Sequence, residues 1–246
     1  MKLIPRAQAR KITPVHIACI NKATVDLGVP MAMLTRALQK AYDEHFLPIW
    51  GYPVKLYNTQ KPRPGDWCLY YLDDARDDDC YGLHDLTHRG QPMAKVFVRD
   101  TQADGGHISV VASHEIFEMA IDPLANLWAQ ATQRTLYAYE MCDPVEEDFF
   151  PVDGFQISNF VYPTWFEAFH HPKGTQFDHM GLLKKPFSKR ASGYVIIKRN
   201  GRVKEIWGSK AKKKRFLGED RWDHRSEFRK GRGHGLLTKY RKWKAK

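Results

Sequence analysis

Two features that would define a protein class are missing from this sequence: closely spaced cysteine pairs and long apolar runs. The four cysteines are scattered, at Cys19, Cys68, Cys80 and Cys142. Without a CxxC spacing they predict neither a zinc knuckle nor a disulfide framework, and we expect reduced thiols. No stretch approaches the roughly 18 apolar residues of a membrane-spanning helix. No apolar segment follows the basic residues near Met1, so we expect a cytoplasmic protein without a secretory signal or a membrane partner.

Charge is divided unevenly along the chain. The formal net charge is +11 over 246 residues, but residues 189–246 hold 21 Lys and Arg against 5 Asp and Glu. The remaining 188 residues hold 18 basic and 23 acidic side chains, so they are mildly acidic. With 43% hydrophobic and 13% aromatic residues the chain can bury a core, which excludes wholesale disorder. The basic C-terminal part indicates an anionic partner: nucleic acid, an acidic protein surface or a neighbouring subunit.

Hydrophobic periodicity predicts an α+β protein. Helices are expected over residues 29–45 and 107–121, and strands over residues 49–57, 67–72, 93–98 and 155–161. Asn200-Gly201 separates two apolar runs, residues 194–198 and 203–207, and predicts a hairpin. The chain divides into a domain of residues 1–188, a β-hairpin of residues 189–208 and a basic arm of residues 209–246.

The stretch of residues 110–123, VVASHEIFEMAIDP, carries the residue types suited to metal-dependent catalysis. On a helix His114 and Glu118 are one turn apart and face the same side, so both can bind one metal ion. Glu115 stands beside the first ligand, where it can act as general base toward a metal-bound water. The motif is therefore HExxE, in place of the HExxH of zinc proteases.

Two acidic residues compete for the place of third metal ligand. Glu140, in the segment YEMCD, lies 22 residues after Glu118. Asp122 lies eight positions after His114, on the same helical stripe, although Pro123 can tilt it away. We expect His114, Glu118 and Glu140 to form the site, with Asp122 as the alternative third ligand.

The HExxE helix followed by Glu140 and Asp143 resembles the gluzincin branch of the zincin metallopeptidases. The strings SHEIFEMAIDP, YEMCDPVE and ISNFVYPTWF are also similar to a zincin-like family that has members in bacteriophage genomes. The similarity covers about residues 50–207. It implies a zincin-like domain of mixed sheet and active-site helix, a zinc ion, hydrolysis of a peptide substrate, and residues 93–98 as the edge strand above the cleft. It also implies that Asp143 orients His114, and that the protein belongs to a phage, in the bacterial host or in the virion.

Glu118 departs from the zinc-protease pattern, which has histidine at this position. One histidine with two carboxylates makes a harder site, and the extra negative charge weakens the Lewis acidity of a bound zinc ion. Manganese or iron then competes with zinc, and turnover is expected to be low or absent. The alternative function is a non-catalytic zincin scaffold that serves as a structural or accessory component of the virion.

Cations and aromatic residues alternate in the C-terminal arm. The cations in question are Lys212, Lys213, Lys214, Arg215, Arg241, Lys242 and Lys244. Such mixing suits contacts with phosphates and stacking on bases. The same composition also serves an arm that binds neighbouring virion subunits. Because no known DNA- or RNA-binding motif accompanies it, sequence-specific recognition is not predicted.

Overall fold

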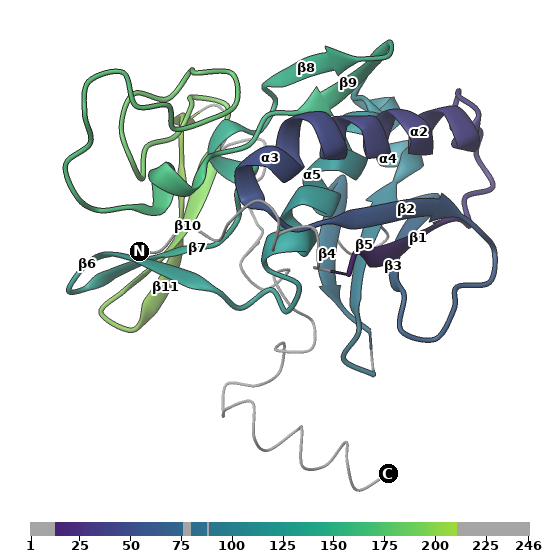
Figure 1. Ribbon diagram of the computed structural model, residues 1–246, viewed down its shortest axis with the longest axis horizontal. Coiled ribbons are helices and arrows are strands. Elements are labelled where there is room, and N and C mark those ends of the chain that lie inside the picture. The colour runs from purple at the N-terminus through teal and green to yellow at the C-terminus, as the bar shows by residue number, and fades with distance from the viewer. Residues whose placement is uncertain (1–12, 76–79, 88, 211–246) are drawn as a thin grey trace, which may run out of the picture.

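A mixed sheet of five strands forms the N-terminal part of the structure. The computed structural model describes residues 13–75, 80–87 and 89–210. The strands are β1 (Val15–Asn21), β2 (Val54–Asn58), β3 (Trp67–Leu72), β4 (Gly82–Leu86) and β5 (Pro92–Phe97). They lie in the order β2-β1-β3-β5-β4, as Figure 1 shows. All are parallel except β4, which pairs antiparallel with β5 at the edge of the sheet.

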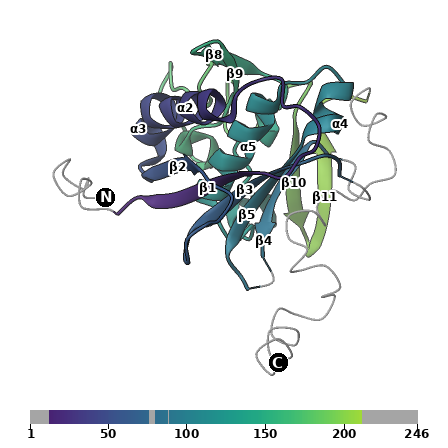
Figure 2. The same cartoon turned by 90° about the vertical axis from the view of Figure 1, so that its right-hand side faces the viewer.

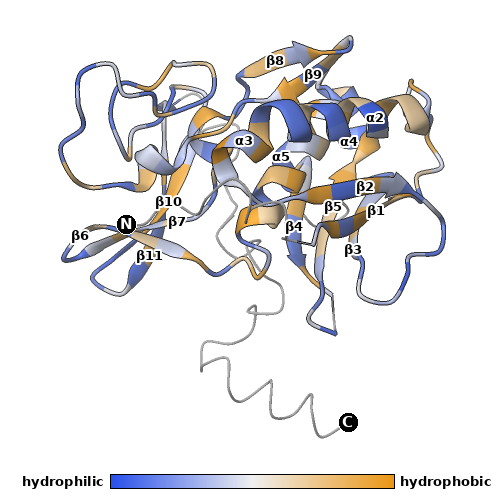
Figure 3. Ribbon diagram, viewed as in Figure 1, coloured by the Kyte–Doolittle hydropathy of each residue, from blue (hydrophilic) through white to orange (hydrophobic). Residues whose placement is uncertain are grey.

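Helices cover one face of this sheet. They are α2 (Met31–Ala41), α3 (Leu47–Trp50), α4 (Val98–Ala103) and α5 (Ile108–Ile121), with a π-helical turn, η1 (Tyr42–Phe46), between α2 and α3. Figures 1 and 2 show α2 and α5 side by side over the sheet. Helix α2 is amphipathic: it buries Leu34 and Leu38, and its other face is hydrophilic in Figure 3. Helix α5 is buried along most of its length, which is typical of a helix enclosed by other elements.

A second, antiparallel sheet follows in the C-terminal part. Its strands are β6 (Trp128–Thr132), β7 (Thr135–Ala138), β10 (Tyr194–Arg199) and β11 (Arg202–Trp207), in the order β11-β10-β7-β6. The chain between β7 and β10 contains a β-hairpin and two short 3₁₀ helices, namely β8 (Phe149–Val152), β9 (Phe155–Ser158), η2 (Asp143–Val145) and η3 (Pro163–Phe166). Because β10 pairs with β7, the C-terminal hairpin is joined to the rest of the protein through this sheet.

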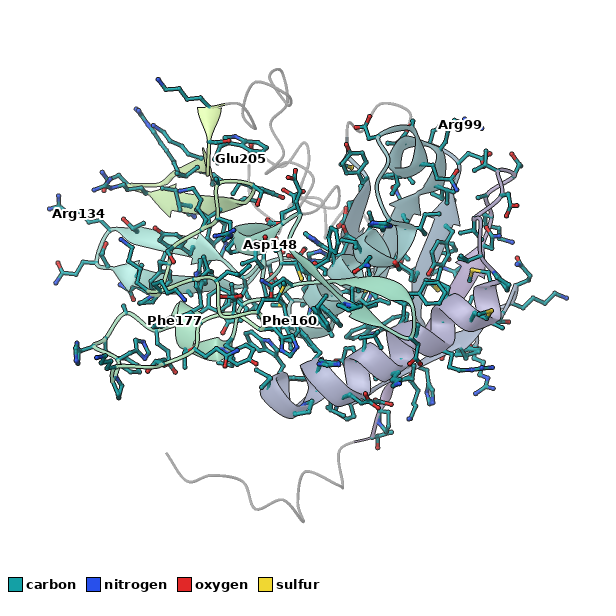
Figure 4. All side chains as sticks on the ribbon, turned by 90° about the horizontal axis from the view of Figure 1, so that it is seen from above. Arg99, Arg134, Asp148, Phe160, Phe177 and Glu205 are labelled. Carbon is teal, nitrogen blue, oxygen red and sulfur yellow. The ribbon has the colours of Figure 1, made fainter. Side chains whose placement is uncertain are left out.

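An aromatic cluster joins the helices to the C-terminal part. The ring of Phe117 on α5 stacks on Phe46, with centroids 4.3 Å apart, and Phe160 packs edge-on against both. All three side chains are buried. Phe160 lies in the interior in Figure 4, whereas Arg99 and Arg134 extend from the periphery. Each such aromatic pair adds about 0.5–1.5 kcal/mol to the stabilisation from burial alone, so the cluster holds α5 in place.

Most of the elements predicted from the sequence are confirmed. The helix predicted over residues 29–45 is present as α2 and η1, which together span Met31–Phe46, and residues 67–72 form β3. The helix predicted over residues 107–121 is α5, which begins at Ile108 and ends at Ile121, where expected. The C-terminal hairpin turns at Asn200 (φ +50°) and Gly201 (φ +79°), the left-handed conformations that a tight two-residue turn requires. All four cysteines are free and buried, as expected.

Two strand predictions are wrong. Residues 49–57 were expected to be one strand, but helical structure continues to Trp50 and ends at Gly51 in a left-handed conformation, so β2 begins only at Val54. Residues 93–98 were expected at the edge of the sheet, but β5 lies between β3 and β4. The edge strand is β4, which is hard to recognise in the sequence because it is short and its two polar residues, His84 and Asp85, are adjacent.

The fold is therefore α+β with a mixed sheet, as predicted. Across the part of the chain that the structure describes, no helix has the length and apolar character to cross a membrane. The cations predicted to bind nucleic acid or a partner lie outside the described residues; these are Lys212, Lys213, Lys214, Arg215, Arg241, Lys242 and Lys244.

Candidate metal centre

Helix α5 carries the HExxE motif into the interior. Its apolar residues contact β5 and β9 and bury the helix, so Glu115 and Glu118 are only 5% and 3% exposed. Strand β4 approaches the helix closely at Gly82. A Cβ atom at this position would lie 2.6 Å from Val111 Cγ1 and 2.8 Å from Glu115 Oε1, so only glycine fits without movement of its neighbours.

Strand β4 supplies a histidine that faces the two glutamates. His84 Nδ1 lies 3.4 Å from Glu118 Oε2 and 3.6 Å from Glu115 Oε2. His84 is 5% exposed, and its Nε2 atom makes no hydrogen bond to any described residue. The three side chains form one group whose ligand atoms lie within 4.8 Å of one another. This His/Glu/Glu group has the composition and spacing to hold a metal ion.

A second group is centred on His114. Its Nε2 atom lies 3.4 Å from Glu118 Oε2 and 3.3 Å from Asp143 Oδ1, and these three residues also fall within 4.8 Å of one another. Glu118 is thus common to both groups, through the same oxygen. Its other oxygen, Oε1, accepts a hydrogen bond of 3.0 Å from the backbone N–H of Cys142, which fixes the direction of the carboxylate.

The separations within both groups suit a metal site better than direct hydrogen bonds. An N–H···O bond usually spans about 2.7–3.2 Å. Metal bonds of about 2.0–2.2 Å place neighbouring atoms of a tetrahedral ligand set about 3.3–3.6 Å apart. The four distances from His84 and His114 to Glu115, Glu118 and Asp143 are 3.3–3.6 Å. The residues of this chain therefore fit a metal ion.

The segment after β7 brings two further carboxylates to the cluster. Asp143 begins η2 and faces His114, while Glu140 Oε2 lies 3.7 Å from Nε2 of His84. Both are at most 5% exposed. Asp143, predicted to orient His114, thus lies within the His114 group, and Glu140, predicted as third ligand beside His114, faces the other histidine.

The charges of this cluster shift the pKa values of its members. Burial by itself lowers the pKa of His84, but the carboxylates of Glu140, Glu115 and Glu118 outweigh it and raise the pKa well above the usual value. The pKa of His114 is likewise raised against burial, chiefly by Glu118. Burial raises the pKa of Glu115 and, with the charge of Glu118, that of Asp143. The metal-free cluster therefore retains protons in place of a cation.

Asp122, the alternative third ligand, has a different environment. Its oxygens accept hydrogen bonds from the backbone N–H groups of Asn126 and Leu127, at 2.8 and 2.9 Å. Helix α5 ends one residue earlier, so Asp122 has left the helical stripe of His114. It belongs to neither metal-binding group and stabilises the turn after the helix.

A pocket of about 350 Å³ opens onto the cluster. Its wall includes all six clustered side chains, and residues 80–84 before and within β4 form one side. Phe149 of β8 and Tyr194 and Ile196 of β10 add apolar surface on the other side. The candidate centre therefore lines a pocket whose wall includes residues from both sheets.

His84 is the residue that the sequence analysis missed. It lies 30 positions before His114 in a short strand, GLHDL, that carries no metal-binding spacing. Comparisons with protein-family models, with curated proteins and with solved structures each found no match for this chain. Its function is therefore inferred from the geometry of the site.

Proposed function

We propose that the protein is a metal-dependent hydrolase of the zincin type that cleaves peptide bonds, with zinc held by His114, Glu118 and Asp143. The observation that carries this proposal is the spacing of 3.3–3.4 Å from His114 Nε2 to both carboxylates. When bound, the cation would act as a Lewis acid toward a carbonyl and lower the pKa of water. Manganese or iron fits the same oxygen-rich ligand set.

Glu115 is the general base in this proposal. It follows His114 on α5, lines the pocket and is positioned by His84 at 3.6 Å. Burial raises its pKa above that of a free carboxyl group, which makes it a stronger base than an exposed glutamate. The carboxylate would take a proton from the attacking water and return it to the leaving amine.

The edge strand supports a peptide as the substrate. Within the described residues β4 pairs with β5 alone, and Gly82, Leu83 and His84 of this strand line the pocket. An extended peptide can pair with such an edge. The mixed sheet beside the HExxE helix and the zincin resemblance of the sequence both support this proposal.

Metal content and cleavage test the proposal together. Wild-type protein purified without added metal should contain zinc, manganese or iron, and His114→Ala should lose it. Glu115→Gln should retain the cation of the His114 group and lose cleavage of casein. Glu147→Gln is the matched control, because this glutamate lines the same pocket but belongs to neither group. Undiminished cleavage by Glu115→Gln would exclude the mechanism.

A second function, as a structural or accessory component of a phage virion, is favoured by the C-terminal hairpin. Asn200 N–H donates to the backbone oxygen of Arg134 at 3.3 Å, so the turns of β6–β7 and β10–β11 lie side by side. The exposed cations of these two turns and their strands are Arg134, Lys198, Arg199, Arg202 and Lys204. Together with the basic C-terminal sequence they provide a surface for DNA or for an acidic subunit.

Removal of residues 209–246 tests this second function. The truncated protein should remain folded and fail to enter virions, whereas normal incorporation would exclude the role. Binding to DNA through these cations should weaken steeply as ionic strength rises. Salt-insensitive binding, or no binding, would exclude DNA as the partner.

A further inference from the structure

We propose that the cluster binds two divalent cations bridged by Glu118, the second cation being held by His84, Glu115 and Glu118. The proposal rests on the proposed function for the first cation, at His114, Glu118 and Asp143. Each group of three places its ligand atoms within 4.8 Å of one another, and the two histidines belong to different groups. A single cation therefore cannot be bound equally well by both groups of ligands.

The carboxylate of Glu118 is oriented for a bridging role. Its Oε2 atom lies 3.4 Å from a nitrogen of each histidine, His84 Nδ1 and His114 Nε2. Its Oε1 atom is engaged by the backbone N–H of Cys142. Because that hydrogen bond holds one oxygen, the other is directed between the two imidazoles, where it can contact a cation on either side.

His84 has no evident structural task that an apolar residue would not perform as well. It is 5% exposed and its Nε2 atom has no hydrogen-bond partner among the described residues. Buried imidazole nitrogens in that state are unfavourable. Both sides of the ring face carboxylates, Glu118 and Glu115 at Nδ1 and Glu140 at Nε2. This environment suits a ligand of a cation.

The charge of the fully ionised cluster also suits two divalent cations. Four carboxylates line it, from Glu115, Glu118, Glu140 and Asp143. Two divalent cations balance four carboxylates while both histidines remain neutral, as metal ligation requires. One divalent cation leaves two buried negative charges, which are unfavourable without a partner. Imidazole and carboxylate donors accept zinc and manganese alike.

A second cation changes the role of Glu115. As a ligand, this carboxylate cannot accept a proton, so the second cation opposes the general-base function proposed above. Hydrolysis should therefore be greatest with the His114 group alone occupied and should decline as the second group fills. Hydrolysis would therefore rise with cation concentration while the first position fills and fall while the second position fills.

The experiment is equilibrium dialysis of the metal-free, full-length protein against zinc chloride, followed by elemental analysis. Wild type should bind two zinc ions per chain, and His84→Ala and His114→Ala one each. His107→Ala is the matched control, because His107 lines the same pocket outside both groups, and it should bind two. Circular dichroism establishes that each variant is folded, and His84→Leu, which fills the buried space, replaces His84→Ala if that variant unfolds.

The outcomes separate this inference from the proposed function. One zinc ion in wild type that persists in His84→Ala and is lost in His114→Ala overturns the second position and leaves the proposed function intact. One zinc ion that is lost in both variants means a single shared position and also overturns the inference. No zinc in any folded protein overturns both.

Discussion

Gly82 on β4 and Glu115 on α5 are in direct contact, and a side chain on Gly82 would compete with the carboxylate. A Cβ atom there would lie 2.8 Å from Glu115 Oε1 and 2.6 Å from Val111 Cγ1. The short distance between β4 and α5 depends on the absence of a side chain at Gly82. The same short distance brings His84 close to Glu115 and Glu118.

Gly82→Ala should therefore be destabilising. Overpacking of this kind typically costs about 1–3 kcal/mol, and we expect that loss in urea unfolding, together with weaker metal binding. The double variant Gly82→Ala/Val111→Ala should recover part of the loss, because it removes the closest obstacle. Additive losses in this cycle would contradict the steric explanation.

Asp143 and Glu140 are distinguished by which histidine they face. Asp143→Asn should abolish binding of the first cation, because it removes the carboxylate that lies 3.3 Å from His114 Nε2. Glu140→Gln should leave that cation in place, since its oxygen faces His84 instead. Elemental analysis of the two variants checks both expectations, and the reverse pattern would restore Glu140 as third ligand beside His114.

Asp122→Ala should lower stability without changing metal content. The carboxylate accepts two backbone hydrogen bonds after α5, and each such hydrogen bond contributes about 0.5–1.5 kcal/mol. Thermal unfolding and elemental analysis of the same sample measure the two effects. Loss of the cation in a folded Asp122→Ala protein would make Asp122 a ligand after all.

Metal affinity should rise with pH. The raised pKa values of His84 and His114 mean that the metal-free cluster carries protons, and these must leave before the nitrogens bind a cation. Each proton released weakens binding about tenfold for every pH unit of acidification below its pKa. Competition with a chelator at several pH values measures this slope, and an affinity independent of pH would exclude ligation by these histidines.

His179 should make stability depend on pH on the acidic side. Burial, followed by the nearby charge of His45, lowers the pKa of His179 from 6.5 to about 4. Between these values the unfolded chain binds the proton and the folded protein does not, so stability is complete above about pH 6.5 and declines as pH falls toward 4. Because His179 is partly exposed, we expect a loss of about 1–2 kcal/mol rather than the full effect of the shift.

The His179→Gln variant is the control for this effect. Urea unfolding of wild type and variant at several pH values should give a smaller slope for the variant in that window. His45, Tyr162 and Asp178 lie around His179, and an unchanged slope in the variant would show that His179 is not the source of the pH dependence.

The HExxE helix and the C-terminal hairpin were predictable from local signals. Helix α5 has apolar residues and a terminating Asp122-Pro123, and the hairpin has Asn200-Gly201 between two apolar runs. Hydrophobic periodicity and turn residues act over a few positions, so they can be recognised in the sequence without knowledge of the fold. The spacing of His114 and Glu118 follows from the geometry of any α-helix.

The edge strand was not predictable in the same way. Whether residues 93–98 or residues 82–86 lie at the edge depends on the pairing of strands distant in sequence, and a strand carries no local mark of its neighbours. The antiparallel pairing of β4 with β5 places His84 opposite α5. The sequence by itself showed a histidine at position 84 but predicted no strand there; its part in the centre comes only from that pairing.

The order of the carboxylates was likewise decided by tertiary structure. Glu140 and Asp143 are three residues apart in an irregular segment, where no helical or strand period relates their directions. The backbone N–H of Cys142 donates to Glu118 between them, and that anchor turns Asp143 toward His114 and Glu140 toward His84. The sequence determined the helix, its metal-binding spacing and the acidic residues downstream. Only the packing of β4 and this anchored segment against α5 decided which of those residues meet, because ligand geometry depends on contacts between distant parts of the chain.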